Sequence, residues 1–267
     1  MCSVGEDFHI LDQILNKNIL RYSEQRVGNE IMENDNVQYV RDIYLHSSAA
    51  DYCKYVAKDC DAIAAVLYEY WVCYNNVYPE KLHFFPLPVV MENMDSQEYS
   101  ISEKVRLFIG LQKERMNIKG TDIMLKAAQD IVRDYPDKAI LQVAENVPYA
   151  EYEQMLTNAD VLLDQLYSYT PAMNALLAMS KGIVAVTGGE QENYDIIGEQ
   201  ELRPIINVQP TYESVYEELK KLVLHKEIIP ELKRQSVEYV RKHHDYHKVA
   251  QQYEDFYKKL LAENIVH

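Results

Sequence analysis

Short apolar runs alternate with amphipathic stretches through the second half of the chain. Such mainly apolar runs are typical of parallel strands that are buried on both faces. They occupy residues 105–109, 139–143, 161–163, 183–186 and 204–208. Between them, helices are predicted at 121–134, 148–158, 211–224 and 229–242, the first with Ile123, Ala127 and Ile131 on one face. Strands that alternate with helices of this length predict an α/β fold with a parallel sheet and right-handed crossovers.

The first part of the chain shows a weaker version of the same alternation. We expect a helix over 7–23, a strand at 37–40, and a helix that Ser47 or Ser48 caps and that ends near 57. A strand at 62–66, a helix at 68–74 and a strand at 82–85 follow. These elements are typical of the end of a Rossmann-like domain whose beginning lies outside the chain.

Four segments follow from these elements. Residues 1–90 are expected to be a partial N-terminal Rossmann-like lobe, and the polar stretch 91–103 an interdomain linker. Residues 104–243 would form the C-terminal Rossmann-like domain. Residues 244–267, after the pair His243-His244, would form a last helix that packs back on the first lobe.

Charge and cysteine content narrow the class of partner. The formal net charge is −15, which argues against nucleic acid as a partner, because nucleic acid requires a basic face. An anionic ligand must therefore meet local positive charge. The four cysteines have no Cys-x-x-Cys spacing, which favours reduced thiols and a cytoplasmic location. The most apolar run, 62–74, is too short to span a membrane.

A strand, a loop and a helix start near residue 164 form a candidate binding site. The strand at 161–163 is followed by Pro171, which suits the first turn of a helix, and by Gly182, which suits a left-handed C-terminal cap. Ligands of open α/β sheets bind at the carboxyl ends of strands, and the free N–H groups of a helix start favour phosphate. Asp164 and Gln165, at the strand end, are candidates for binding hydroxyl groups, although such residues are also often plain caps.

Arg115 and Lys119 fall in one predicted loop, 111–119, and Gly120 follows directly before a helix. The functional interpretation is that both cations neutralise a diphosphate and stabilise the charge that grows on a leaving group. The alternative is a solvated basic turn. Gly188 and Gly189 follow the strand at 183–186 and either bring the backbone close to a ligand or form an ordinary turn.

The order of these motifs resembles a known family. Asp160-Val161-Leu162-Leu163-Asp164-Gln165, then Ala175 to Gly182 and an apolar strand, is similar to the donor-binding half of retaining glycosyltransferases of the family-4 type. Upstream, Phe108-Ile109-Gly110, Arg115 and Lys119-Gly120-Thr121-Asp122 match that family's first strand, basic loop and helix start. The resemblance covers about residues 80 to 260 and implies the GT-B fold, with two Rossmann-like lobes of which the first is incomplete.

The resemblance also implies an activity. It indicates a hexosyltransferase-type enzyme that moves a sugar with retention from a nucleotide-sugar donor to a glycan or lipid-linked acceptor, with no cofactor and no metal. Peripheral membrane association through the absent part of the first lobe is left open, and no catalytic residue is named. The expected donor-binding residues are Gly110, Arg115, Lys119, Asp164, Gln165, Thr170, Met173, Asn174, Gly188 and Gly189.

One departure from the family supports a rival hypothesis. The family carries two glutamates with seven residues between them, and Tyr169 and Leu177 stand at those positions here. By resemblance, the second glutamate holds the donor's ribose hydroxyls, which Leu177 cannot do. The rival is a non-catalytic, glycosyltransferase-like subunit that acts as a binding module.

Other chemistries lack their motifs. The chain has no Gly-x-Gly-x-x-Gly, no Walker lysine motif and no Gly-x-Ser-x-Gly, so dehydrogenase, NTPase and hydrolase interpretations lose their main support. His243, His244 and His247 do not follow a zincin order and are expected to form a cap or hinge between two helices.

Overall fold

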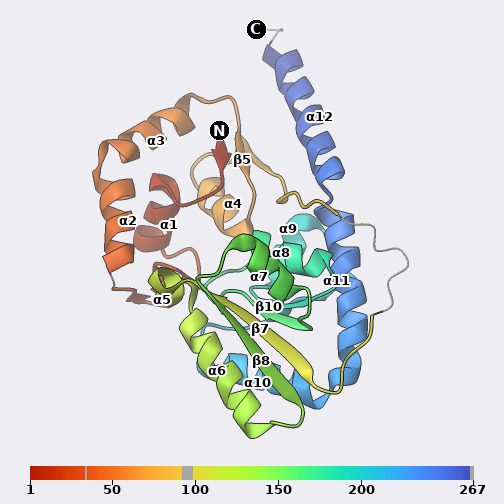
Figure 1. Ribbon diagram of the computed structural model, residues 1–267. Helices are drawn as coiled ribbons and strands as arrows, with labels where there is room; N and C mark the ends of the chain where they lie inside the picture. Colours follow the sequence, from red (N-terminus) through yellow and green to blue (C-terminus); the bar gives the residue numbers. More distant parts are fainter. Residues whose placement is uncertain (34, 92–98, 265–267) are drawn as a thin grey trace. The chain divides into compact units, whose positions relative to one another are not determined.

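The computed structural model describes residues 1–33, 35–91 and 99–264 (Figure 1). The chain divides into two compact units. Unit 1 comprises Met1–Val90 and His243–His267, and unit 2 comprises Met91–Lys242. Much of the expected linker, residues 92–98, lies outside the described residues. No helix in the described ranges combines the length and the apolar character needed to cross a membrane.

Unit 1 contains a three-stranded parallel sheet in the order β1-β5-β6. Its strands are β1 (Cys2–Ser3), β5 (Ile63–Ala65) and β6 (Leu82–Phe84). The residues of the central strand β5 are all buried, which fits a strand covered on both faces. A small antiparallel sheet, which the sequence analysis did not predict, consists of β2 (Tyr22–Ser23), β3 (Arg26–Val27) and β4 (Glu30–Ile31).

The helices of unit 1 differ from expectation in two places. They are α1 (Phe8–Lys17), α2 (Asp35–His46), α3 (Ser48–Asp59), α4 (Tyr68–Asn75) and α12 (Tyr246–Asn264). The expected strand at 37–40 is wrong, because these residues lie in α2. Val37 is buried whereas Gln38 and Tyr39 are exposed, a distribution that suits one helical face. The first helix stops at Lys17 because Asn18 adopts a left-handed conformation with φ of 54°.

The last helix, α12, belongs to unit 1. The rings of Phe85 and Tyr253 stack with centroids 4.2 Å apart. At the start of the helix, the Val89 amide donates to the His244 carbonyl at 2.7 Å, and the Tyr246 amide donates to the Val89 carbonyl at 3.1 Å. The segment that leaves β6 is therefore joined by backbone hydrogen bonds to the segment that enters α12.

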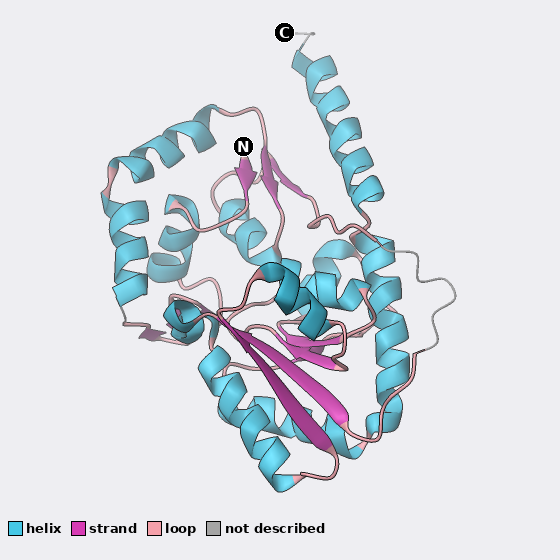
Figure 2. Cartoon of the chain, in the orientation of Figure 1, coloured by secondary structure: helices cyan, strands magenta, loops and turns pink. Residues whose placement is uncertain are grey.

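Unit 2 contains a five-stranded sheet in the order β11-β10-β9-β7-β8, in which every pairing is parallel. The strands are β7 (Val105–Leu111), β8 (Ala139–Glu145), β9 (Val161–Leu163), β10 (Val184–Thr187) and β11 (Ile206–Asn207). Figure 2 shows the long strands β7 and β8 side by side. The expected α/β class with parallel sheets is confirmed.

Helices connect these strands or follow the last of them. They are α5 (Met116–Lys119), α6 (Thr121–Asp134), α7 (Tyr149–Leu156), α8 (Met173–Ser180), α9 (Gln191–Ile197), α10 (Tyr212–Leu224) and α11 (Ile229–His243), with short 3-10 turns at Lys113–Arg115 and Lys226–Ile228. Helix α6 has the predicted bounds. The expected loop at 111–119 is instead largely helical.

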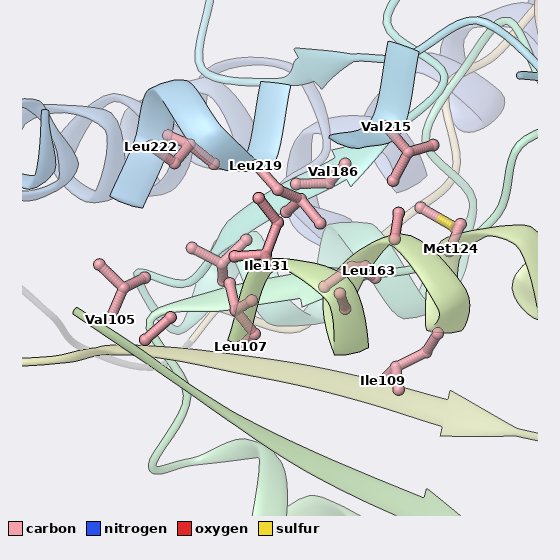
Figure 3. Packing of buried hydrophobic residues seen from close by; sticks show 14 of the residues in the cluster. Val105, Leu107, Ile109, Met124, Ile131, Leu163, Val186, Val215, Leu219 and Leu222 are labelled. Carbon is pink, nitrogen blue, oxygen red and sulfur yellow. The ribbon is translucent and has the colours of Figure 1, made fainter. Parts of the chain in front are cut away.

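Strand β7 separates two apolar layers. Val105, Leu107 and Ile109 point to the face that α6 and α10 cover, where Ile131 and Leu219 pack against them (Figure 3). Phe108 points to the opposite face, together with Leu156 of α7 and Ala178 of α8. The period-2 alternation of a strand thus divides one mainly apolar run between two cores.

The central β9–α8–β10 unit sets the position of the candidate site. Pro171 precedes α8 instead of lying in its first turn, since Ala172 is the N-cap. Gly182 adopts φ of 72° after the helix, as its place in the sequence predicted, and Val184 pairs with Val161 of β9. The loop between β9 and α8 therefore begins at the carboxyl edge of the sheet.

Candidate functional site

A pocket of about 550 Å³ opens at the carboxyl ends of three adjacent strands, β9, β7 and β8. This edge of a parallel sheet is where α/β proteins bind ligands. Asp164 directly follows β9, and the other lining residues come from the ends of β7 and β8 and from α5 to α8. They are Gly110, Leu111, Gln112, Lys119, Thr121, Ala144, Asn146, Val147, Tyr149, Tyr152, Asp164 and Asn174.

Gly110 gives the pocket room for an aromatic ring. A Cβ atom at this position would lie 2.6 Å from Cε2 of Tyr152, so only glycine lets the two approach this closely. The Tyr152 ring also packs edge-on against Phe108, with centroids 5.2 Å apart. Gly110 therefore leaves the space that the Tyr152 ring fills in the pocket wall.

Lys119 reaches the pocket from the last position of α5. Its carbonyl accepts a hydrogen bond from the Leu166 amide at 2.8 Å, which ties α5 to the loop after β9. Gly120 follows with φ of 67° and packs against the Leu166 side chain, with a Cβ clearance of only 2.9 Å. Lys119 and Asp164 are the only basic and acidic side chains that line the pocket within the described ranges, and neither is exposed.

Three side chains form a directed chain of hydrogen bonds. The Tyr152 hydroxyl donates to Oδ1 of Asn174 at 2.8 Å, and Nδ2 of Asn174 donates to Oδ1 of Asp164 at 2.7 Å. Asn174 therefore presents its oxygen to Tyr152 and its amino group to Asp164. The Asp164 side chain is 6% exposed, and its Oδ2 atom is buried with no hydrogen-bond partner in the described part of the chain.

Burial shifts the pKa values of both ends of this chain. Desolvation raises the pKa of Asp164 above its ordinary value, against the opposing effects of the Asn174 hydrogen bond and the Lys119 charge. Desolvation likewise raises the pKa of Tyr152 to about 12, so the phenol keeps its proton and stays a donor at neutral pH. Perturbed groups in a pocket mark a functional-site candidate.

The expected donor-binding residues divide into two groups. Gly110, Lys119, Asp164 and Asn174 line the pocket. Arg115, Gln165, Thr170, Met173, Gly188 and Gly189 are not among the lining residues.

Arg115 and Met173 are exposed to solvent, Met173 by 47%. Arg115 ends the 3-10 turn that precedes α5. The turn and the helix separate it from Lys119 although the sequence places both in one short segment. Thr170 is 3% exposed, and the Gln165 carbonyl accepts a hydrogen bond from the Thr187 hydroxyl at 3.2 Å.

Packing accounts for both glycines after β10. A Cβ atom on Gly188 would collide with the backbone carbonyl oxygen of Ser168, and one on Gly189 would lie 2.6 Å from Cγ2 of Ile205. The Gly189 amide donates to Oδ1 of Asn207 at 2.9 Å, and Nδ2 of Asn207 donates to Glu190 at 3.0 Å. The turn is held against neighbouring strands and loops.

Tyr169 and Leu177 supply no carboxylate at the positions where the family has glutamates. Tyr169 is 1% exposed, Leu177 is half-buried on α8, and neither lines the pocket. Asn174 occupies the helical turn before Leu177 on the same helix. The carboxylate of this pocket comes instead from Asp164 at the end of β9.

Sequence reasoning missed Tyr152, Tyr149 and Asn146, which the β8–α7 region contributes. Asn146 adopts φ of 51°, a conformation that asparagine tolerates better than most residues, but this angle is visible only in the structure. Tyr152 carried no signal in the sequence, because its role depends on a partner on another helix. In the described residues, no group of three or more His, Cys, Asp or Glu side chains is placed to hold a metal ion.

The fold is that of an α/β protein whose parallel sheets resemble those of GT-B glycosyltransferases. Comparison with solved structures confirms the resemblance to retaining glycosyltransferases of the family-4 type at the level of the fold. No family model and no curated protein sequence matches the chain.

Three solved structures illustrate the similarity. A point mutant of S. aureus TarM, solved with fondaparinux, α-GlcNAc-glycerol and UDP, matches with a TM-score of 0.60 and 9% identity over 78% of this chain and 46% of its own. The pneumococcal O-GlcNAc transferase GtfA, in complex with UDP and GlcNAc, matches with a TM-score of 0.57 and 10% identity over 80% and 48%. Anabaena HepE, in complex with UDP and glucose, gives 0.59 and 10% over 80% and 68%. The chain thus spans about half the length of the first two.

Proposed function

We propose that the pocket of unit 2 binds a nucleotide sugar and that the chain is the donor-binding part of a retaining, hexosyltransferase-type glycosyltransferase. The observation that carries the proposal is the placement of Lys119, Asp164 and Asn174 around one pocket at the carboxyl ends of β7 and β9. A cation beside a polar acceptor suits a ligand that carries both phosphate and hydroxyl groups. The solved proteins of the same fold that were crystallised with UDP support this ligand class.

In this proposal Lys119 meets the diphosphate. Its ammonium group would neutralise the charge that grows on the leaving nucleoside diphosphate as the glycosidic bond breaks. Asn174, in the first turn of α8, would bring the free amides of that helix start close to the same group. Gly110 and Tyr152 would form the wall beside it. The acceptor, a glycan or a lipid-linked sugar, and any acid or base belong to parts of the enzyme beyond unit 2.

Calorimetry tests this function directly. The protein is titrated with UDP-, GDP- and ADP-glucose, and saturable binding of at least one is expected. A folded protein that binds none of the three contradicts the proposal. The relative affinities for the three nucleotide sugars also identify the base that the pocket prefers.

The second candidate is a non-catalytic, glycosyltransferase-like subunit that uses the pocket for binding alone. The observation that favours it is the absence of a carboxylate at Tyr169 and Leu177, the first of which is buried outside the pocket. Release of nucleoside diphosphate from the bound nucleotide sugar, measured with candidate acceptors, separates the two functions. Turnover supports the enzyme, whereas binding without turnover supports the subunit.

A further inference from the structure

We infer that Asp164 determines ligand specificity by accepting a hydrogen bond from a hydroxyl group of the bound molecule, and that Asn174 and Tyr152 position it for this. The pocket would then select a polyhydroxylated ligand and not merely an anion. This inference rests on the proposed function in one respect, namely that the pocket of unit 2 is the ligand-binding site. It names a second point of recognition, separate from the phosphate contact assigned to Lys119.

The first support is the position of the carboxylate. Asp164 is 6% exposed and lines the pocket, so it belongs to the floor and not to the rim, where Tyr149 is 64% exposed. Its Oδ2 atom has no hydrogen-bond donor among the described residues. A buried charged acceptor without a donor is costly, and a ligand hydroxyl at the floor of the pocket would remove that cost.

The second support is the direction of the hydrogen bonds that reach Asp164. Tyr152 donates to Asn174, which must then turn its amino group toward Oδ1 of Asp164. Oδ1 is thereby occupied by a protein donor, and the second oxygen is the one left for the ligand. Without Asn174 and Tyr152, the carboxylate would be free to rotate or to approach Lys119.

The third support is the charge pattern. Lys119 acts on Asp164 electrostatically, yet no ion pair joins them in the described part of the chain. The pocket thus keeps one cation and one carboxylate available at separate points. A nucleotide sugar matches both, with its diphosphate for Lys119 and a sugar or ribose hydroxyl for Asp164, whereas inorganic pyrophosphate matches only the first.

Protonation gives an independent signature. The titratable side chains that share the pocket with Asp164 are Lys119 on α5 and Tyr149 and Tyr152 on α7. Burial raises the pKa of the Asp164 carboxyl. A protonated carboxyl is a weaker acceptor than a carboxylate, so binding of a hydroxyl-bearing ligand should weaken as pH falls through this pKa.

The Asp164→Asn variant tests the inference. The substituted amide keeps a carbonyl oxygen for the Asn174 donor and places an NH₂ group where Oδ2 stood, which inverts hydrogen-bond polarity at the pocket floor with little change in size. We expect nucleotide-sugar binding, measured by calorimetry with UDP-, GDP- and ADP-glucose, to weaken by about 10-fold or more. Pyrophosphate binding should stay the same or strengthen. The exposed Asp137→Asn variant is the charge-matched control and should bind both probes like the wild type.

The outcomes separate this inference from the proposed function. Equal binding of the nucleotide sugar by wild type and Asp164→Asn overturns the inference and leaves the proposed function standing. If the wild type binds no nucleotide sugar but binds glucose in ligand-observed NMR, and the variant does not, the proposed function fails and the inference holds. Binding of neither ligand overturns both. Should the variant fail to fold, the wild type decides alone: nucleotide-sugar binding that keeps or gains affinity as pH is lowered to the limit at which the protein stays folded contradicts a carboxylate acceptor.

Discussion

Lys233 on α11 donates a hydrogen bond from Nζ to Oδ1 of Asp160 at 2.6 Å, and both side chains are almost fully buried, 9% and 0% exposed. Asp160 lies directly before β9. Its Oδ2 atom also accepts hydrogen bonds from the backbone amide and Nε of Arg106 on β7, at 2.9 and 3.2 Å. One carboxylate therefore joins the amino ends of two central strands of unit 2, β9 and β7, to helix α11.

Breaking this cluster should destabilise the protein. Asp160→Asn should lose about 3 to 5 kcal/mol of unfolding free energy, because it leaves the buried Lys233 ammonium without a carboxylate. Lys233→Met should lose about 3 kcal/mol, because it removes one of the two cations that pair with the buried Asp160 carboxylate. Denaturation in urea measures both. The surface pair of Arg234 with Glu231 provides the control, since both side chains are 53% exposed and Arg234→Ala should change stability by less than about 1 kcal/mol. If Lys233→Met is as stable as the wild type, the pair of Lys233 and Asp160 contributes nothing to the unfolding free energy.

Lys119 and Arg115 should differ in their effect on binding. Lys119→Ala is expected to weaken nucleoside-diphosphate binding by about 1 to 3 kcal/mol, the cost of a lost charge-assisted hydrogen bond. Its unfolding free energy should stay within about 0.5 kcal/mol of the wild type. Nucleoside affinity should hardly change.

Because Arg115 is exposed and does not line the pocket, Arg115→Ala serves as the matched control and should have the smaller effect. If Lys119→Ala binds the nucleoside diphosphate as well as the wild type does, Lys119 is an ordinary basic residue of a solvated turn.

Gly188 should be required for folding more than for ligand contact. In Gly188→Ala the new Cβ atom collides with the backbone carbonyl of Ser168, which has no flexible end to move aside. We expect a loss of about 3 kcal/mol in unfolding free energy, at the upper end of typical overpacking costs. Thermal unfolding compares it with Gly5→Ala, where no atom lies within 4 Å of the new methyl group. Equal stability of the two variants would show that the turn after β10 has room for the methyl group beside the Ser168 carbonyl.

His244 should make unit 1 sensitive to acid. Burial lowers the pKa of its imidazole to about 4 in the folded protein, from 6.5 in a model peptide, while the Leu87 carbonyl hydrogen-bonds Nδ1 at 2.9 Å. The unfolded chain therefore binds the proton more readily. The stability that neutral His244 contributes is complete above pH 6.5 and is lost as pH falls toward 4, by on the order of 3 kcal/mol.

The His244→Asn variant isolates this effect, because its amide can donate to the Leu87 carbonyl but has no titratable proton. The difference in unfolding free energy between variant and wild type should depend on pH between about 7 and 4. His9, whose pKa burial also lowers, is present in both proteins and cancels in that difference. A constant difference across this range would show that His244 does not titrate on unfolding.

The parallel sheet of unit 2 could be predicted because its strands lie in short, mainly apolar runs that alternate with helical patterns along the chain. The strand at 37–40 was predicted wrongly because four residues cannot distinguish period 2 from a helical face, on which Val37 is buried. Gly110, Lys119, Asp164 and Asn174 could be predicted as site candidates from their places in a motif. Tyr152 could not, because its importance comes from a contact with Asn174 on another helix. Arg115 was misplaced because the expected loop folds into helical turns.

The hydrogen bonds between Val89 and the segment of His244 and Tyr246 bear on how the chain is made. Unit 1 is discontinuous: its second segment, His243–His267, follows a continuous unit 2. During synthesis, all of Met91–Lys242 emerges before Val89 can meet its partners. A ribosome-bound chain that stops near Lys242 would thus carry every residue of unit 2, whereas unit 1 would still lack the helix that packs on Phe85.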